Sequence, residues 1–314
     1  MDEKIKISEI CYYGYAGLDL AKIKSALPLH VGDEFADYMH YHQACLKVKD
    51  SVLKVVGKPS SEEALIFYDK RYVVYIGLPG KSNQALALLP VPTGQVTASL
   101  KVTARIHELY EATMQANNRQ LRSADEKDKQ TYADLGEQTK KEALKNPDAL
   151  MHVLKSSADV KERLVAAHAL GLIASSKEQL ETLVLASADS DRVVRNNAIR
   201  ALGVILTDHP EYAPQIPCKL FVDLINSPEW TDRNKGVFVL LGLSKSRNTE
   251  VLAEMRARCL PSLIEMCQWP EGYSGSALML LGRVGNLPDE KIEALIHTHD
   301  QGAIIKAAQA SDKL

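Results

Sequence analysis

The stretch Asp-Ser-Asp-Arg-Val-Val-Arg-Asn-Asn-Ala-Ile-Arg-Ala-Leu-Gly, residues 189–203, decides the fold of the C-terminal half of the chain. Its ending recurs: Leu-Gly pairs place glycines at 171, 203, 242 and 282, which are 32, 39 and 40 residues apart. Two columns of small or apolar residues precede each pair at a spacing of three, which puts both columns on one helix face. The columns are Ala166, Ala198, Val237 and Ala277, and then Ala169, Ala201, Leu240 and Leu280.

A second apolar helix precedes each of these helices. The four segments are 149–154, 180–185, 220–225 and 260–266. Helix pairs at a period of roughly 40 residues indicate an α-solenoid, in which each pair buries its apolar face against its neighbours. We therefore expect about four repeats over residues 146–314. A helix from Asp289 to His297 and a tail from Ala303 to Ala310 should cap the end.

The residues from Asp191 to Gly203 resemble a HEAT repeat, whose pattern is Asp, then Val-Arg, then Ala, and finally Ala-Leu-Gly. The first copy keeps the aspartate and the arginine, as Asp159 and Arg163. Counted back from the Leu-Gly pair, Asn234 and Ser274 stand at the arginine position of the third and fourth copies. The resemblance thus implies an Asp–Arg ladder that is incomplete, with apolar packing in its place in the C-terminal half.

Residues 1–95 have a different pattern. Runs rich in β-branched and aromatic residues at 5–13, 64–68 and 72–76 predict strands. Helical spacing predicts helices at 18–27 and 35–56. The order β-α-α-β-β predicts a small α+β domain ahead of the all-α solenoid.

The segments Ala26-Leu27-Pro28-Leu29 and Val31-Gly32-Asp33-Glu34-Phe35 lie between the two predicted helices. With the element order, they make this region resemble a POTRA module. Such a module binds polypeptide by adding a strand to an exposed sheet edge. The alternative is a small α+β domain that only caps the helical array.

Residues 96–145 connect the two parts. A long helix is predicted from Thr97 to Leu121. Residues 122–145 are almost wholly polar and predict a solvated loop or an exposed helix start. The predicted domains are therefore 1–95, 96–145 and 146–314. The stripe of the long helix that should face the core is Leu100, Val102, Ile106, Leu109, Tyr110 and Met114.

Composition limits the classes of partner. The 314 residues include 38 Lys and Arg against 40 Asp and Glu, a formal net charge of −2 that disfavours nucleic-acid and membrane-surface binding. No apolar stretch approaches the roughly 20 residues that span a bilayer. Five cysteines without a CxxC pair are expected to be small buried hydrophobes. The compartment stays open: the periplasm if a leader was trimmed, and the cytoplasm otherwise.

Motifs for chemistry are missing from the sequence. It contains no phosphate-binding glycine loop, no HExxH and no GxSxG. The pairs His40/His42 and His297/His299 have a spacing that suits metal chelation poorly on a helix. We therefore predict no catalytic residues, no metal and no cofactor.

One polar cluster stands out on the second helices of repeats two and three. If those helices line a concave surface, the cluster forms a groove with an aromatic anchor, and Arg and Trp are common at binding hot spots. The alternative is that these side chains cap helices and bridge repeats. The residues are Arg192, Arg195, Asn196, Asn197, Trp230, Asp232, Arg233, Asn234 and Lys235.

The whole arrangement resembles a group of uncharacterised bacterial HEAT-repeat proteins with an N-terminal POTRA-like domain. The segments Val194-Arg195-Asn196-Asn197-Ala198, Leu281-Gly282-Arg283-Val284 and residues 226–235 carry that resemblance, which implies no known activity. The expected function is a non-enzymatic scaffold or adaptor. It would bind a protein or peptide partner through the concave face of the repeats, with the sheet edge as a second surface. The alternative is an enzyme of unrecognised, lyase-like type that uses the same groove.

Overall fold

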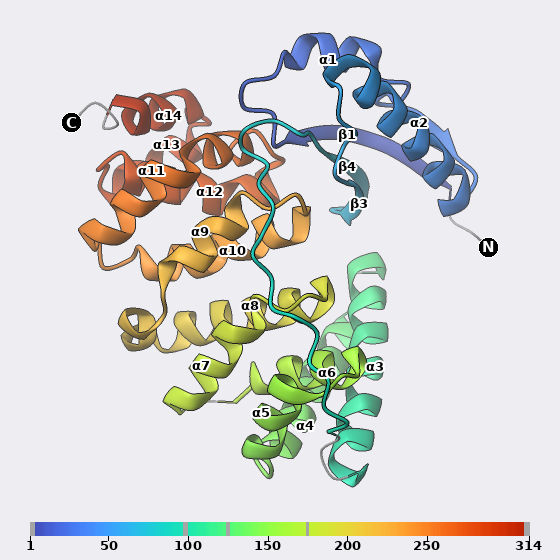
Figure 1. The fold of residues 1–314 in the computed structure, drawn as a ribbon, viewed down its shortest axis with the longest axis vertical. Helices are drawn as coiled ribbons and strands as arrows, with labels where there is room; N and C mark the ends of the chain where they lie inside the picture. Colours follow the sequence, from blue (N-terminus) through green and yellow to red (C-terminus); the bar gives the residue numbers. More distant parts are fainter. Residues whose placement is uncertain (1–3, 97–99, 124–125, 174–175, 311–314) are drawn as a thin grey trace. The chain divides into compact units, whose positions relative to one another are not determined.

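The computed structural model describes residues 4–96, 100–123, 126–173 and 176–310. Packing divides the chain into two compact units (Figure 1). Met1–Leu86 and Phe221–Leu314 form the first unit, and Ala87–Leu220 forms the second. The predicted boundaries at residues 95 and 145 follow the order of the chain, whereas this division follows its packing. Each unit is described by itself below.

The first unit begins with a four-stranded sheet in the order β2-β1-β4-β3. Strands β1 and β4 pair in parallel, and β4 pairs with β3 through the tight turn at residues 69–70. The predicted β-α-α-β-β order is confirmed, and the two-residue strand β2 is an addition that the sequence did not indicate. The elements are β1 (Ile5–Tyr13), α1 (Leu20–Ala26), β2 (Glu34–Phe35), α2 (Tyr38–Val56), β3 (Glu63–Tyr68) and β4 (Arg71–Gly77).

Helices α1 and α2 cover one face of this sheet. Their apolar stripes meet the alternate side chains of β1 and β4 in one core, which includes Ile7, Ile23, Val48 and Val74. Asp37 caps the N-terminus of α2: its carboxylate accepts a hydrogen bond from the backbone N–H of His40.

The opposite face of the sheet packs on the C-terminal helices. Tyr13 of β1 packs on the ring of Trp269, and Tyr75 of β4 packs on the rings of both Trp230 and Trp269, with ring centroids 4.9–6.3 Å apart. Because both faces of β4 are covered, residues 73–76 are buried without interruption. The sheet is therefore packed on both faces, against α1 and α2 on one side and through aromatic rings against the C-terminal helices on the other.

The C-terminal part of the first unit is helical, with α11 and α12 packed as a pair and α13 and α14 packed on α12. Helices α13 and α14 lie where the sequence predicted a C-terminal helix and tail. The helices are α9 (Cys218–Ile225), α10 (Trp230–Leu243), α11 (Thr249–Met266), α12 (Glu271–Val284), α13 (Asp289–His297) and α14 (Gln301–Ala310).

The second unit contains a long helical hairpin and two helix pairs of the repeat. Helices α3 and α4 form the hairpin, α5–α6 and α7–α8 are the pairs, and a 3₁₀ helix follows. The bounds are α3 (Leu100–Ser123), α4 (Glu126–Ala143), α5 (Pro147–Ser156), α6 (Val160–Leu170), α7 (Lys177–Ala186), α8 (Arg192–Asp208) and η1 (Pro210–Gln215).

The connector differs from its prediction in part. The long helix is present as α3, although its predicted start at residues 97–99 and the side chains of Leu100 and Val102 lie outside the described residues. The polar stretch after it, expected as a loop or a helix start, is the full helix α4. Its weak stripe of Tyr132, Leu135, Thr139 and Ala143 packs against α3, and that packing stabilises a helix of otherwise polar composition.

At two of the four Leu-Gly pairs, the glycine lies at a close approach of helices. A Cβ atom added at Gly171 would lie 2.6 Å from Cβ of Ala201 on the next second helix. At Gly282 an added Cβ would lie 2.5 Å from the side chain of Ile292 in the cap. Both distances are too short for any side chain, so glycine is required where these helices cross.

The arginine ladder is more complete than the sequence indicated. Arg163, Arg195 and Arg233 are each the fourth residue of their helices, and all three side chains are buried. Each donates to the carbonyl oxygen of the residue six positions earlier, across the turn within its repeat. Counting back from the Leu-Gly pair had placed Asn234 at this position, one residue too far along. The prediction that the third copy lacks its arginine is therefore wrong.

Candidate functional site

The nine residues of the predicted groove fall in both units. Arg192, Arg195, Asn196 and Asn197 lie on α8 of the second unit, whereas residues 230–235 open α10 of the first. Six of the nine are buried, which corrects the expectation of an open groove lined by all of them. Binding of a partner by this set stays a prediction. The buried six are Arg195, Asn197, Trp230, Asp232, Arg233 and Asn234.

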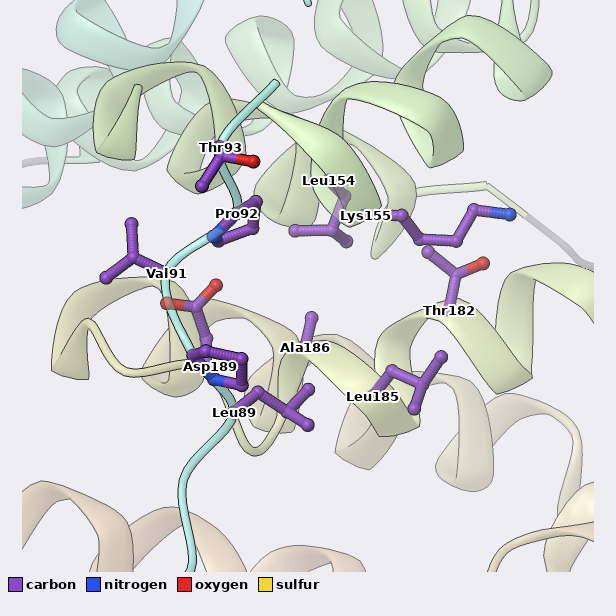
Figure 2. Close-up of a pocket in the computed structure, with 11 residues that line it drawn as sticks. Leu89, Val91, Pro92, Thr93, Leu154, Lys155, Thr182, Leu185, Ala186 and Asp189 are labelled. Carbon is purple, nitrogen blue, oxygen red and sulfur yellow. The ribbon is translucent and has the colours of Figure 1, made fainter. Parts of the chain in front are cut away.

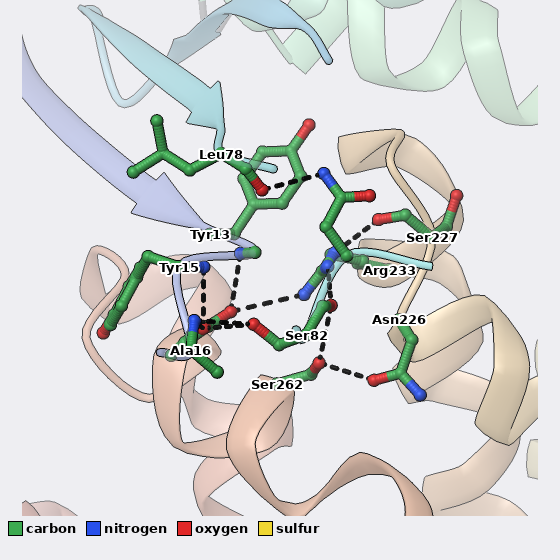
Figure 3. Close-up of polar contacts among 12 residues, drawn as sticks. Tyr13, Tyr15, Ala16, Leu78, Ser82, Asn226, Ser227, Arg233 and Ser262 are labelled. Carbon is green, nitrogen blue, oxygen red and sulfur yellow. Dashed lines mark hydrogen bonds and ion pairs between the residues drawn. The ribbon is translucent and has the colours of Figure 1, made fainter. Parts of the chain in front are cut away.

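Arg233 is the centre of a buried polar network in the first unit (Figure 3). Its Nε donates to the carbonyl oxygen of Ser227 at 2.7 Å, and Nη2 donates to the carbonyl oxygen of Ser82 at 2.5 Å. The guanidinium lies 4.8 Å from the ring centroid of Tyr13. Burial lowers the pKa of Arg233 from its ordinary value, and the neighbouring Glu265 opposes that shift.

Glu265 of α11 completes the network. Its carboxylate accepts hydrogen bonds from the backbone N–H groups of Gly14 at 2.7 Å, Tyr15 at 3.0 Å and Ala16 at 2.9 Å. Gly14 has a left-handed backbone, with φ of 73°, which turns successive N–H groups toward one anion. The hydroxyl of Ser82 donates at 2.5 Å, and Nη1 of Arg233 lies 3.5 Å from Oε2.

A second carboxylate fastens Trp230 to the sheet. Glu62 Oε2 accepts from the backbone N–H of Trp230 at 2.7 Å and from the hydroxyl of Tyr13 at 3.1 Å. The Tyr13 hydroxyl also lies 3.0 Å from the carbonyl oxygen of Pro228. Trp230 and Arg233, which the sequence placed in a groove, thus join the N-terminal sheet to the C-terminal helices. Both side chains are buried in this joint.

An apolar cavity of about 570 Å³ lies in the second unit (Figure 2). This volume is within the usual range of small ligand sites. One wall is the segment of residues 88–94, called the strap below, and the other wall is the C-terminal part of α5 and α7. The lining residues are Leu89, Pro90, Val91, Pro92, Thr93, Leu154, Lys155, Thr182, Leu185, Ala186 and Asp189.

Main-chain hydrogen bonds hold the strap to the turns of two consecutive repeats. The backbone N–H of Leu89 donates to the carbonyl oxygen of Ala188 at 2.7 Å. The N–H of Ala158 donates to the carbonyl oxygen of Gly94, also at 2.7 Å, and Gly94 forms a parallel bridge with Ser157. Between these points the strap is neither helical nor turned. It therefore lies on the repeats as an extended peptide does on a binding surface.

The charged groups at the cavity have partners of their own. Asp189 is bound by Arg163 through two hydrogen bonds of 2.8 and 3.0 Å, which link the first repeat of this unit to the second. The Lys155 ammonium lies 3.1 Å from the Glu178 carboxylate. The remaining lining is mainly aliphatic, so the cavity suits apolar side chains rather than a charged substrate.

The sequence reasoning missed both the strap and Glu265. A signal for the strap existed, because Leu88-Leu89-Pro90-Val91-Pro92 is strongly apolar for a loop. Prolines fix an extended backbone without being able to donate hydrogen bonds, which suits a chain laid on a surface. No comparable signal marked Glu265, whose donors lie about 250 residues away in the chain.

Three of the five thiols are buried and held in their protonated form. Burial raises the pKa of Cys11, Cys259 and Cys267 above the ordinary value of a thiol, so these groups stay protonated at neutral pH. The prediction that cysteines act as small buried hydrophobes is confirmed for these three and for Cys45. Within the described ranges, no group of three or more His, Cys, Asp or Glu is placed to hold a metal ion. None of the described helices is both long and apolar enough to cross a bilayer.

His168 on α6 makes the second unit sensitive to acid. Burial, with a smaller contribution from Arg200, lowers its pKa to about 4. The ring packs edge-on against Tyr110 of α3, with centroids 5.1 Å apart. Because the unfolded chain takes up the proton near the ordinary pKa of 6.5, the stability that neutral His168 gives is lost as pH falls from about 6.5 toward 4.

We expect wild-type stability to fall by about 2 kcal/mol between pH 7 and pH 5 through His168 alone. His168→Phe keeps an aromatic ring against Tyr110 and removes the titration. Urea denaturation at the two pH values, for both proteins, measures the difference. An identical fall in the variant would show that His168 is not the group responsible.

Comparison with known proteins gives matches among solved structures only. No protein-family model matches the sequence, and no curated protein sequence matches it. Among solved structures, an engineered protein from a structural genomics programme is 17% identical with a TM-score of 0.41, covering 67% of this chain and 96% of its own. A designed armadillo repeat protein in complex with the peptide (KR)4 is 16% identical with a TM-score of 0.41, covering 65% of this chain and 99% of its own.

Proposed function

We propose that the protein is a non-enzymatic scaffold that binds an extended polypeptide on its helical repeats. The observation that carries this proposal is the strap, which is bound by its main chain to the turns after α5 and α7. The repeat surface thus already holds one extended peptide, supplied by the chain itself. Main-chain bonds give affinity for such a peptide, and pockets beside the backbone give specificity. The cavity beside the strap is such a pocket.

Two finer assignments belong to the same proposal. The repeats are HEAT-like, with Arg163 and Arg195 each fourth in the second helix of its pair. The N-terminal region is POTRA-like, which is supported by a mixed sheet in which β3 is an edge strand. That edge is a second candidate surface, because an edge strand carries unpaired backbone groups. Of the predicted groove, Arg192, Asn196 and Lys235 keep exposed or half-exposed side chains.

The test is selection of peptides from a displayed random library on the purified protein, followed by measurement of their affinity for variants. Leu185 lines the cavity and is 51% exposed, so Leu185→Asp should leave α7 folded. We expect that variant to weaken binding of the selected peptides at least tenfold, because a carboxylate placed in an apolar pocket loses its hydration.

Leu144→Asp is the matched control, because Leu144 is similarly exposed and lies outside the cavity lining. It should bind the peptides as wild type does. Loss of binding in Val204→Asp with no loss in Leu185→Asp would move the site to the exposed face of α8. A library that yields no peptide would count against the scaffold function itself.

A further inference from the structure

The strap is poorly packed for a segment that covers an apolar cavity. Leu89 is 42% exposed and Val91 is 55% exposed, although both are aliphatic. Pro90 and Pro92 carry no N–H, so that stretch of the strap has few groups able to donate to the repeats. About 570 Å³ stays empty between the strap and the helices. The surface of the repeats beneath the strap, called the seat below, is thus larger than the strap that occupies it.

Gly94 fixes the end of the strap by close backbone contact. A Cβ atom added there would lie 2.5 Å from the carbonyl oxygen of Ser156, which cannot move without disturbing the end of α5. The bond between Gly94 and Ala158 therefore requires glycine. Any larger residue at position 94 lifts this end of the strap while leaving the repeat helices unchanged in sequence.

We propose that the strap is an internal competitor, and that the partner is an extended, proline-containing apolar peptide that displaces it. This inference rests on the proposed function and adds both the chemistry of the partner and its regulation. The strap itself shows which chemistry the seat accepts: aliphatic side chains next to prolines, with glycine where the backbones meet. A partner with larger apolar side chains beside its prolines fills the cavity that the strap leaves empty.

The strap is part of the same chain as the seat, and this tethering determines how much it lowers the apparent affinity of a free peptide. A tethered segment competes at an effective concentration in the millimolar range for a short linker. A free peptide of the same sequence must overcome that competition in the wild type. It meets none in a protein whose strap has been released, so its apparent affinity rises there.

The experiment uses a fluorescent synthetic peptide with the sequence of residues 86–96 and measures its binding to the full-length protein by anisotropy. We expect Gly94→Val to bind it at least tenfold more tightly than wild type does. Adding Leu185→Asp to Gly94→Val should abolish that gain. A second peptide with phenylalanine in place of the valine of position 91 should bind Gly94→Val more tightly still.

Circular dichroism of Gly94→Val checks that the helices are intact. A peptide that itself carries valine at position 94 is the negative control, since it meets the same clash with Ser156. Equal affinities of wild type and Gly94→Val would overturn the internal competition. If library-selected peptides still depend on Leu185 in that case, the proposed function stands and this inference alone fails. Tight binding of the negative-control peptide would show that the seat does not require glycine at position 94, contrary to this inference.

Discussion

Glu265→Leu should lower the free energy of unfolding by about 3–5 kcal/mol, the largest effect of any single substitution considered for this protein. The change removes the acceptor of three backbone N–H groups and of the Ser82 hydroxyl. It also leaves Arg233, which is completely buried, without the carboxylate beside it. A buried charge that loses its partner costs far more than a lost surface contact.

Urea denaturation followed by circular dichroism measures this loss. Limited proteolysis should also show earlier cleavage in the loop after β1, because Glu265 anchors residues 14–16 to α11. Glu265→Gln keeps an acceptor oxygen and should fall between wild type and the leucine variant.

Glu34→Leu is the control. Glu34 forms an ion pair of 3.0 Å with Lys6, but its side chain is 53% exposed. Water screens an exposed pair, so its removal should change the free energy of unfolding far less than the loss of Glu265 does. Comparable losses in Glu34→Leu and Glu265→Leu would mean that water reaches the Arg233–Glu265 pair, and the network would then not fasten the two parts of the unit together.

The elements with a clear period could be predicted from the sequence. The second helices of the repeats, the two-helix cap and the β-α-α-β-β order lie where apolar spacing placed them, because local periodicity and capping residues determine them. The prediction failed where the stripe was weak, as in α4. It also failed for Arg233, because the repeats were aligned on the Leu-Gly pair at the end of each second helix, whereas the arginine keeps its position relative to the start of that helix.

The role of Arg233 and Trp230 could not be predicted, because it depends on contacts distant in the chain. In the sequence, a charged or aromatic residue on the second helix of a repeat is equally compatible with an open binding groove and with a buried contact between elements. What decides between them is the sheet, which brings Tyr13 and the turn at Gly14 against α10 and α11. The sequence shows that residues 1–95 form a separate pattern and does not show which helices that pattern packs on.

The strap illustrates a different limit. Its prolines and its glycine are typical of an irregular segment, and irregular segments are ordinarily solvated connectors. The strap contacts the repeats through backbone groups: the N–H of Leu89 donates to Ala188, and the carbonyl oxygen of Gly94 accepts from Ala158. The side chains of the two alanines therefore give no sign of this interaction in the sequence. Apolar composition in a loop is the one feature that distinguishes it, and that feature is easily taken for an element boundary.

Gly14→Ala is the second large effect, and it tests whether backbone geometry at this turn holds the Glu265 network together. We expect a loss of about 3 kcal/mol in the free energy of unfolding. Roughly 1 kcal/mol comes from forcing a Cβ into the left-handed region. The rest comes from a clash, since the new Cβ would lie 2.4 Å from the carbonyl oxygen of Leu78 and 2.8 Å from Cβ of Asn83.

Gly57→Ala separates these two contributions. Gly57 ends α2 with φ of 80°, close to the 73° of Gly14, and an added Cβ there meets no atom within 4 Å. It should therefore show the backbone cost alone, about 1 kcal/mol. Urea denaturation of both variants gives the difference. A difference of about 2 kcal/mol means that the turn at Gly14 cannot shift away from Leu78 without losing its N–H donors to Glu265. Equal losses in the two variants would mean that the turn at Gly14 shifts away from Leu78 without further loss of stability. The carboxylate of Glu265 would then be held chiefly by Ser82 and Arg233.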